Sequence, residues 1–397
     1  MGPFEGTSIL PIHRYAAWGT ERVIHGEGAF EDLGREVDAL GARRVFVLVS
    51  ASLARETDLR ARLERLLGTR IAGWQPGMPQ HMPRAAIIEA AAAARQAETD
   101  LLVCVGGGSI VDSAKLVQLC LSESITAAHQ FDPLASGVAA DGSAVLPAIG
   151  PQAIRTVCVP TTLSGAEFTG RAGCVDPERG LKQIFVHRDL APQVVILDPL
   201  LTRATPRALW LSSGMRAVDH AVEGWCSPAA NAYSDGLAVN GLRLLGEGLR
   251  RCARDDADMA ARLQCQLGAW CAIGVLQAGA TMGASHGIGH ALGAFGVQHG
   301  HTSCVMLAPV LRFNRPVNEE RQRALAALLG APDSAADETV EALVRSLGLP
   351  ARLRDTGLDR SRLPAVAQGA MKDRWIHTNP RRIEGVRDVL NILESAW

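Results

Sequence analysis

Three glycines join a short apolar run to a helix-forming segment in Leu101-Leu-Val-Cys-Val-Gly-Gly-Gly-Ser-Ile-Val-Asp-Ser-Ala-Lys115. Bare glycine backbone lets N–H groups crowd a pyrophosphate, and the N-terminal end of a helix favours negative charge, so this order predicts a phosphate loop in an α/β fold. Lys115, one turn into the helix, favours the phosphate interpretation. A tight turn with ordinary helix initiation stays open as the alternative, since Ser109 and Asp112 have the spacing of a capping box. The candidate cofactor-binding residues in this segment are Gly106, Gly107, Gly108, Ser109, Asp112 and Lys115.

Similar β-rich runs alternate with helical patterns from about residue 20 to residue 200. Such alternation is typical of a Rossmann-like, mostly parallel sheet covered by helices. Residues 123–154 contain several glycines and prolines and are too long for an ordinary connection, so we interpret them as a surface excursion or a lid. The other predicted strands are Arg44–Val49, Arg155–Val159 and Gln193–Leu197, and Ala85–Ala97 is a predicted helix.

After Asp198-Pro199 the β-branched runs nearly vanish and amphipathic segments of helical length follow one another to the C-terminus. We therefore expect an N-terminal extension over residues 1–17, a nucleotide-binding α/β domain over 18–204 and an all-helical domain over 205–397. The predicted helices of the last domain include Pro206–Ser213, Met215–Cys226, Ser234–Arg250, Asp258–Ala278 and a histidine-rich segment that follows them.

Composition excludes several classes of function. Of the 397 residues 20% are charged, the net charge is −1, and charges of one sign do not cluster, so we expect no nucleic-acid or membrane partner and a small-molecule ligand. Nine cysteines without a Cys-x-x-Cys pair indicate reduced thiols in a cytoplasmic protein. The sequence has neither a signal-peptide pattern nor an apolar run long enough to cross a bilayer.

Four of the eleven histidines lie within Ser285-His-Gly-Ile-Gly-His-Ala-Leu-Gly-Ala-Phe-Gly-Val-Gln-His-Gly-His301. On a helix, His286 and His290 are four residues apart and share one face, which predicts an active site. Each glycine in this helix costs about 1 kcal/mol of helix propensity relative to alanine, so something is expected to approach the backbone closely. The alternative is a tightly packed core helix with hydrogen-bonded histidines.

Several motifs together resemble the iron-containing (group III) alcohol dehydrogenase family. They are the Gly106–Lys115 loop, Pro160-Thr-Thr-Leu-Ser-Gly-Ala-Glu167, Gly214-Met-Arg-Ala-Val-Asp-His-Ala-Val-Glu223, the histidine segment and Asn379-Pro380-Arg381. The Leu-Ser-Gly-Ala-Glu form resembles the maleylacetate reductase branch. The resemblance implies the dehydroquinate-synthase-like architecture, in which an α/β domain and a helical domain enclose a cleft. It also implies NADH or NADPH over the Gly106 loop, with Thr161 and Thr162 nearby.

In metal-dependent members of that family, an aspartate, a histidine four residues later and two further histidines hold a divalent ion. The resemblance places the three histidines at His220, His286 and His299, and a further active-site histidine at His290. Arg216 occupies the aspartate position. A guanidinium is a permanent cation without a lone pair, and at 4 Å it would repel a divalent ion by about 8 kcal/mol at an effective dielectric constant near 20. We therefore expect no bound metal.

Alternatives stay open around Arg216. It could instead form an intrahelical pair with Glu223 or another neighbour. Asp219 could be proposed as a substitute metal ligand, but a salt bridge or a surface carboxylate is the favoured interpretation. His301 is expected to be exposed to solvent, and Cys304 stands where the reductases carry a polar residue or histidine. The His290–His299 spacing is one residue shorter than in the family.

These features predict hydride transfer from NADH or NADPH to an electron-poor double bond or carbonyl of a small anionic substrate, with maleylacetate to 3-oxoadipate as the leading case. His290 or His286 would supply the proton, while Arg216, His220 and His299 would bind charged groups. Ser50 stands where NAD-specific relatives often carry an acid, so dual cofactor use is expected. The alternatives are a metal-dependent alcohol or aldehyde dehydrogenase of the same fold and a non-catalytic nucleotide-binding protein. The resemblance also implies a homodimer or larger homo-oligomer.

Overall fold

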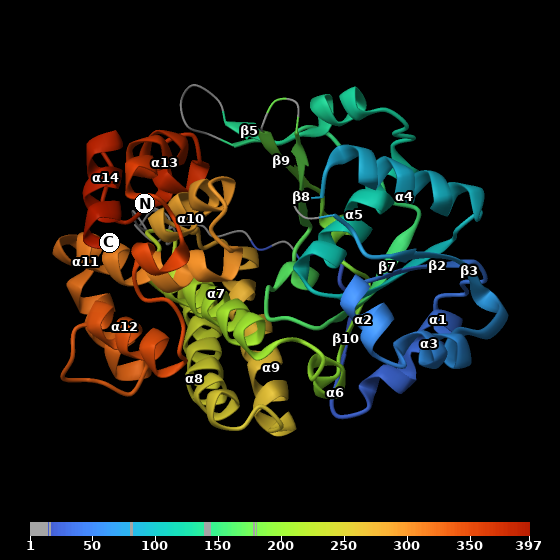
Figure 1. The fold of residues 1–397 in the computed structure, drawn as a ribbon, viewed down its shortest axis with the longest axis horizontal. Helices are drawn as coiled ribbons and strands as arrows, with labels where there is room; N and C mark the ends of the chain where they lie inside the picture. The colour runs from blue at the N-terminus through green and yellow to red at the C-terminus, as the bar shows by residue number, and fades with distance from the viewer. Residues whose placement is uncertain (1–14, 16, 80–81, 139–143, 178, 180) are drawn as a thin grey trace, which may run out of the picture.

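Six parallel strands form the main sheet, in the order β1-β10-β7-β4-β2-β3 (Figure 1). The computed structural model describes residues 15, 17–79, 82–138, 144–177, 179 and 181–397. The strands are β1 Arg22–His25, β2 Val45–Val49, β3 Ile71–Pro76, β4 Leu101–Gly106, β7 Arg155–Pro160 and β10 Val194–Leu197. The four central strands lie within a residue or two of their predicted positions. The sequence pattern does not predict β1 and β3, which are the half-exposed edge strands and lack a continuous apolar run.

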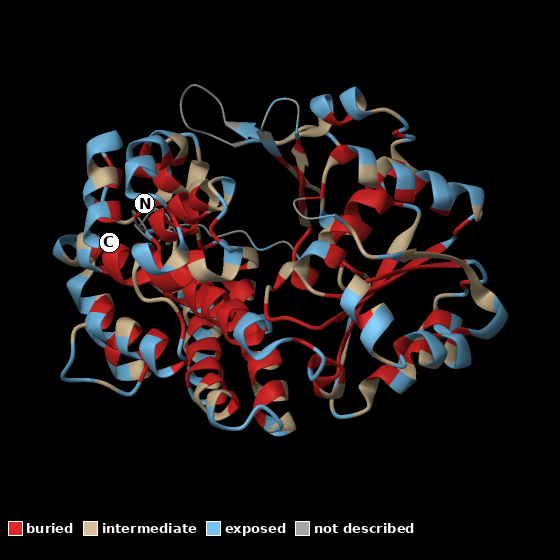
Figure 2. Cartoon of the chain, in the orientation of Figure 1, coloured by how far each residue is buried: buried red, intermediate tan, exposed pale blue. Residues whose placement is uncertain are grey.

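Helices cover both faces of the sheet, as the alternating pattern predicts. The side chains of Phe46 and Leu48 pack with α4 and α5, while those of Val45, Val47 and Val49 pack with α1 and α3 on the opposite face. Because both faces are covered, β2 and β4 are buried along their whole length (Figure 2). The helices are α1 Leu33–Ala39, α2 Ala51–Glu56, α3 Leu59–Leu67, α4 Arg84–Gln96 and α5 Gly108–Ser122.

The described parts of the irregular stretch, residues 123–138 and 144–154, lie beside an antiparallel hairpin that the sequence pattern does not predict. The stretch contains the 3-10 helix η3 Ala128–Leu134 and the short strands β5 Gly137–Val138 and β6 Ala144–Val145. The hairpin consists of β8 Arg171–Asp176 and β9 Leu181–Val186, and the N–H of Ser136 donates to the carbonyl of Ile184 on β9. Val145 and Leu146 are exposed, which fits the surface-excursion interpretation. The predicted N-terminal extension lies outside the described residues except for Tyr15 and Ala17.

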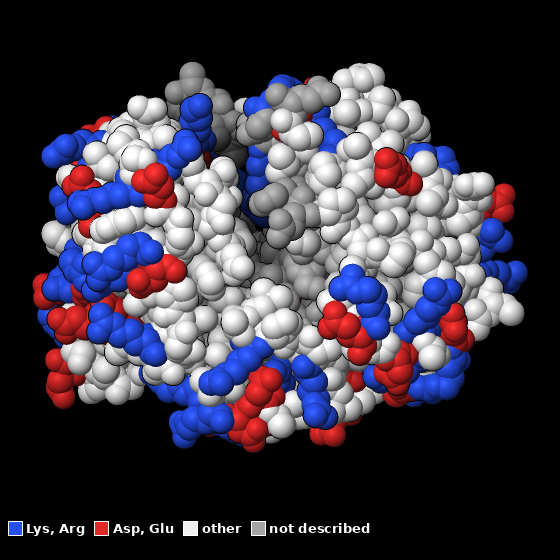
Figure 3. All heavy atoms as spheres, viewed as in Figure 1, with Lys and Arg blue, Asp and Glu red and all other residues white. Residues whose placement is uncertain are grey.

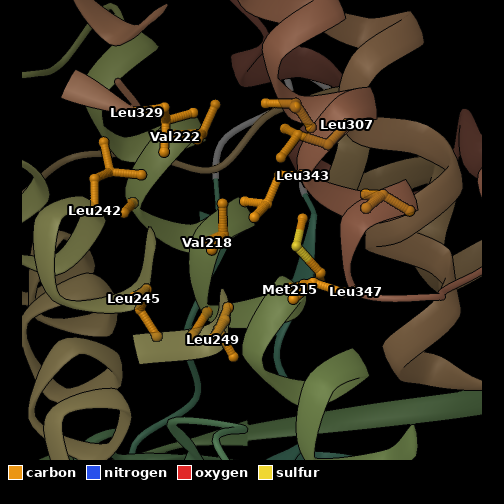
Figure 4. Packing of buried hydrophobic residues seen from close by; sticks show 14 of the residues in the cluster. Met215, Val218, Val222, Leu242, Leu245, Leu249, Leu307, Leu329, Leu343 and Leu347 are labelled. Atoms are coloured by element: carbon orange, nitrogen blue, oxygen red, sulfur yellow. The ribbon is translucent and has the colours of Figure 1, made fainter. Parts of the chain in front are cut away.

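From Pro199 onward, the described chain contains helices and no strand. These are α6 Pro199–Thr202, α7 Arg207–Cys226, α8 Ala232–Arg254, α9 Met259–Gln277, α10 Ala284–Ala294, α11 His299–Leu328, α12 Ala336–Ser346, α13 Leu363–Ala370 and α14 Val386–Ser395. The central helix α7 is almost completely buried, and leucines of α8, α11 and α12 surround its Met215, Val218 and Val222 (Figures 2 and 4). Among the described residues, no helix is both long and apolar enough to cross a membrane.

Two predictions about these helices are wrong. Pro206–Ser213 and Met215–Cys226 form one helix, α7, which continues through Gly214. A Cβ atom added there would lie 3.1 Å from Cδ1 of Leu163 and closer still to Leu249, so tight packing offsets the low helix propensity of glycine. The histidine segment is two helices, because α10 ends at Ala294 and α11 begins at His299.

Candidate active site

The glycine loop lies at the carboxyl edge of the sheet, where the strand order reverses. From β2 the chain runs outward to β3 and returns to β4 on the other side of β2, which creates a crevice of the kind that binds nucleotides. Ser50 follows β2 directly, and Gly106 ends β4. A Cβ atom added at Gly106 would lie 3.1 Å from Oγ of Ser50. Ser50 and the loop therefore line the same crevice.

Parallel pairing of β4 with β7 brings the Pro160-Thr-Thr motif beside this loop. The N–H of Thr161 donates to the carbonyl of Gly106 at 2.9 Å. A Cβ atom added at Gly107 would lie 3.0 Å from Cγ2 of Thr162, and one at Gly108 would lie 2.9 Å from Oγ of Ser164. The structure thus brings Thr161 and Thr162 to the glycine loop. A side chain on any of the three glycines would collide with neighbouring residues such as Thr162 and Ser164.

At the start of α5 the structure excludes the capping-box alternative, and it gives Lys115 a role other than the expected one. Helix α5 has Gly107 at its N-cap without a side-chain cap, so Ser109 and Asp112 do not form the capping box. Lys115 is fully buried, and its Nζ donates to the carbonyls of Ala166 at 2.5 Å and Arg171 at 2.8 Å. Its ammonium is engaged inside the protein, contrary to the interpretation that it faces a phosphate.

Helices α7, α10 and α11 bring the five predicted catalytic residues into one cluster. The ring centroids of His220 and His286 lie 4.8 Å apart, those of His286 and His290 6.5 Å, and those of His290 and His299 6.1 Å. His299 remains within the cluster despite the shorter spacing, because it is the first residue of α11. His220 and His286 are buried, whereas His290 is partly exposed and His299 is exposed.

The guanidinium of Arg216 is buried at the centre of this cluster. Its Nη2 lies 3.4 Å from Nε2 of His290, its Nη1 donates to Oγ of Ser303 at 3.2 Å, and it forms an intrahelical ion pair with Asp219 at 3.8 Å. The pair that the sequence leaves open is therefore made with Asp219. Since a guanidinium can only donate, Nε2 of His290 accepts, and its Nδ1–H donates to Asp373 at 2.7 Å.

Two buried acidic residues, Asp219 and Glu223, lie on the same helix as Arg216. Asp219 accepts hydrogen bonds from the hydroxyls of Ser285 at 2.8 Å and Ser303 at 2.6 Å, so it is not a surface carboxylate. Glu223 accepts the N–H groups of Gly283 and Ser285 and thereby caps α10, and it also pairs with Nδ1 of His286 at 2.7 Å. Burial raises the pKa of Asp219 to about 6 and that of Glu223 to about 8.

All four histidines of the cluster have lowered pKa values. Burial is the main cause for His220, His286 and His290, and repulsion by Arg216 is the main cause for His299. The imidazoles are therefore neutral at neutral pH, and Arg216 is the fixed positive charge among them. Within the described residues, Nδ1 of His220 and Nε2 of His286 are buried without a hydrogen-bond partner.

Protein atoms lie close to three of the four glycines in and beside α10. A Cβ atom added at Gly287 would lie 2.9 Å from the side chain of Ile376, one at Gly289 would lie 3.0 Å from Oγ1 of Thr302, and one at Gly283 would lie 2.9 Å from Oδ1 of Asn379. Gly293 has no atom within 4 Å of such a position. Close helix packing accounts for three of the four glycines, as the core-helix alternative predicts.

Lys182 and Asp373 belong to the site, although the sequence pattern did not identify them. Lys182, on β9, is exposed to solvent, and the surrounding protein and the charge of Arg216 nevertheless lower the pKa of its ammonium. Figure 3 shows a hollow between the two halves of the molecule with basic side chains in it. Lys182 is one of only three lysines in the chain, and Asp373 lies six residues before Asn379-Pro380-Arg381. Both facts were visible in the sequence, but neither indicates a spatial position.

His301 and Cys304 follow His299 on α11, and in the part of the chain that the structure describes no side-chain hydrogen bond or ion pair joins either of them to the cluster. His301 is only partly exposed, in contrast to its expected position in solvent. Cys304 is buried, and burial raises the pKa of its thiol well above the usual range. Its Sγ donates to the carbonyl of Gly300, so Cys304 packs within α11 as an unreactive side chain.

Comparison with known proteins covers both halves of the chain. The family model described as iron-containing alcohol dehydrogenase matches residues 20–199, and the one described as Fe-containing alcohol dehydrogenase family, C-terminal, matches residues 210–397. Dehydrogenase ALT3 of Alternaria alternata is 33% identical over 392 residues, covering 90% of this chain and 99% of that protein. Maleylacetate reductase of Burkholderia cepacia is 31% identical over 373 residues, covering 94% of each. The crystal structure of maleylacetate reductase from Agrobacterium tumefaciens superposes with a TM-score of 0.81 at 26% identity, covering 98% of this chain and 99% of that one.

Proposed function

Because the chain belongs to the iron-containing alcohol dehydrogenase family, whose members are NAD(P)-dependent oxidoreductases, we propose that it reduces a small anionic unsaturated keto acid without a bound metal ion. Maleylacetate, reduced to 3-oxoadipate, is the leading substrate. The observation that carries this proposal is the buried guanidinium of Arg216, which touches His290 and occupies the position of a metal ligand in the family. The homo-oligomer and the cytoplasmic location stay predictions from the sequence.

The donor set does not fit a divalent ion. Asp219, Glu223 and His286 have ligand atoms within 4.8 Å of one another, which is the observation that favours the metal-dependent alternative. However, both oxygens of Glu223 accept backbone N–H groups, one oxygen of Asp219 accepts two hydroxyls, and Arg216 lies 3.8 Å from that oxygen. An ion there would displace the hydrogen bonds of Glu223 and would face a fixed cation, although Oδ1 of Asp219 has no hydrogen-bond partner among the described residues. We therefore derive no step through a metal.

The residues at the carboxyl edge of the sheet fit a dinucleotide. Gly107 is the N-cap of α5 and Gly108 its first residue, and no side chain caps the N–H groups there, which favours a pyrophosphate. Thr161 and Thr162 line the same crevice, and Ser50 would lie near the ribose, with no carboxylate to repel a 2′-phosphate. When bound, NADH or NADPH supplies the hydride.

The cluster itself supplies charge stabilisation and a proton. Hydride addition to the double bond conjugated with a ketone places negative charge on the ketone oxygen, and Arg216 would stabilise the resulting enolate. His290 would then protonate the carbon next to the ketone, after its Nε2 has taken up a proton from solvent once the substrate anion engages Arg216. Asp373 orients the ring through the Nδ1–H group. Of the two candidates for the proton donor, His290 is favoured because His286 is only 3% exposed and is paired with Glu223.

The test is NAD(P)H oxidation by protein that has been freed of metal with a chelator. We expect turnover of maleylacetate that added Fe²⁺ or Zn²⁺ does not increase. The proposal would fail if the stripped protein consumed no NAD(P)H with maleylacetate and instead oxidised simple alcohols after metal was added.

A further inference from the structure

Two arginines from opposite halves of the molecule meet at one tryptophan. Arg171 lies on β8 of the α/β half, and Arg374 begins the 3-10 helix η8 Arg374–Thr378 of the helical half. The Cζ atoms of Arg171 and Arg374 lie 5.7 Å and 3.8 Å from the ring centroid of Trp375. The indole ring therefore holds two positive charges close together across the boundary between the halves.

Neither of these guanidinium groups forms an ion pair among the described residues. Burial lowers the pKa of Arg374, and the charge of the adjacent Asp373 opposes that change without closing a salt bridge. Within the described ranges, no ion pair or hydrogen bond joins the side chain of Arg171 or Arg374, and Nε of Arg171 and Nη2 of Arg374 are buried without an acceptor. Elsewhere in the chain, a stacked arginine is satisfied: Arg321 lies over Trp225 at 4.1 Å, donates to its carbonyl and pairs with Asp235. Burying N–H groups of a cation without an acceptor is costly, so the pair is incomplete without an anion. Burial and repulsion by Arg374 lower the pKa of Arg171 to about 9.

The arginine pair adjoins the proposed catalytic cluster. Asp373, which bonds to His290, directly precedes Arg374. In the hairpin, the strand register places Arg171, Gly173 and Lys182 on one face. The side chain of Lys182 lies over Gly173, because a Cβ atom added at Gly173 would lie 3.0 Å from Cε of Lys182. Lys182, on whose pKa the charge of Arg216 acts, therefore shares a face of the hairpin with Arg171.

We propose that Arg171 and Arg374 bind a second carboxylate of the substrate, so that the site selects a dianion with one group near Arg216 and the other beside Trp375. This inference rests on the proposed function, because it assumes that the reducible substrate lies at the histidine cluster. Guanidinium groups suit a carboxylate because their planar N–H pairs match its two oxygens. A monoanion of the same length would leave the N–H groups of both arginines unsatisfied.

The experiment compares Arg171→Met and Arg374→Met with Arg321→Met, whose arginine also stacks on a tryptophan but has its own acid. Steady-state kinetics are measured with maleylacetate and with an analogue in which the carboxylate assigned to the site beside Trp375 is replaced by a methyl group. In Arg171→Met and Arg374→Met we expect the KM for maleylacetate to rise about tenfold or more, because charge-assisted hydrogen bonds to the substrate are lost. The kcat for maleylacetate and the KM for the analogue should change little. Arg321→Met is expected to leave both KM values unchanged.

Equal losses with both substrates would overturn the proposal, because the arginines would then act only in joining the two halves. If wild-type protein does not reduce maleylacetate, calorimetric binding of adipate and hexanoate separates the two conclusions. Tighter binding of adipate that Arg171→Met abolishes would support the subsite even though the proposed substrate is wrong. Equal binding of the two acids would overturn the subsite. Arg171→Lys, which keeps the charge, is expected to recover part of the affinity and serves where the methionine variant does not fold.

Discussion

Nη2 of Arg216 lies 3.4 Å from Nε2 of His290, so a group that can only donate faces a ring nitrogen that must accept. In the free protein His290 is therefore neutral, with its proton on Nδ1 and directed to Asp373. Repulsion by Arg216 also contributes to lowering the pKa of His290. An anion bound at Arg216 would cancel this repulsion and would favour protonation of His290 at the moment when a proton donor is needed.

The role of Asp373 predicts a change in the pH profile. Its carboxylate raises the pKa of His290 against the larger effect of burial, so Asp373→Asn is expected to lower that pKa further. If protonated His290 is the acid, the limb on which kcat falls with rising pH should move to lower pH, and kcat at neutral pH should fall by about 10²-fold or more. The control is Asp359→Asn, which removes a carboxylate that caps a 3-10 helix elsewhere. A profile that Asp373→Asn leaves unshifted would exclude His290 as the acid.

Ser50 predicts how the cofactor preference can be changed. Because Ser50 lies beside Gly106 in the crevice, Ser50→Asp would place a negative charge near the cofactor ribose. We expect the KM for NADPH to rise by about tenfold relative to that for NADH, since the carboxylate repels the 2′-phosphate. The KM for NADH is the internal control. An equal change in both KM values would show that Ser50 is not near the 2′ position.

The glycines of α10 provide a matched pair for stability measurements. Gly287→Ala would bring a Cβ atom to 2.9 Å from the buried side chain of Ile376, so we expect the free energy of unfolding to fall by about 1–3 kcal/mol. Gly293→Ala meets no atom within 4 Å, and its higher helix propensity should raise the free energy of unfolding by about 0.5–1 kcal/mol. Chemical denaturation measures both. Stabilisation by both substitutions would contradict the close packing of α10.

Local patterns predicted the centre of the fold but not its edges. The buried strands β2, β4, β7 and β10 are continuous apolar runs, so the sequence locates them within one or two residues. Edge strands and the β8–β9 hairpin carry mixed side chains, and their pairing depends on neighbours that are distant in sequence. Helix propensity also divided α7 at Gly214, because the contacts with Leu163 and Leu249 that offset the cost are not local.

The candidate site was predictable where motifs resemble the family, and less so where contacts join separate segments. The motifs identified Arg216 and the four histidines, which the structure brings together. Two hydrogen-bond partners of these side chains, Ser303 beside Arg216 and Asp373 beside His290, lie outside the motifs and have no shared spacing. The same limit applies to Lys115, whose position in the sequence suited a phosphate although its Nζ bonds to carbonyls of another segment.

Chemical rescue of Arg216→Ala tests most directly whether a fixed organic cation performs the role of a metal here. We expect the variant to lose activity with maleylacetate by about 10²-fold or more, because the enolate loses its charged partner. Guanidinium, added below concentrations that unfold the protein, should restore part of this activity, while Fe²⁺ or Zn²⁺ should not. Restoration by the metal ions and not by guanidinium would contradict the proposal.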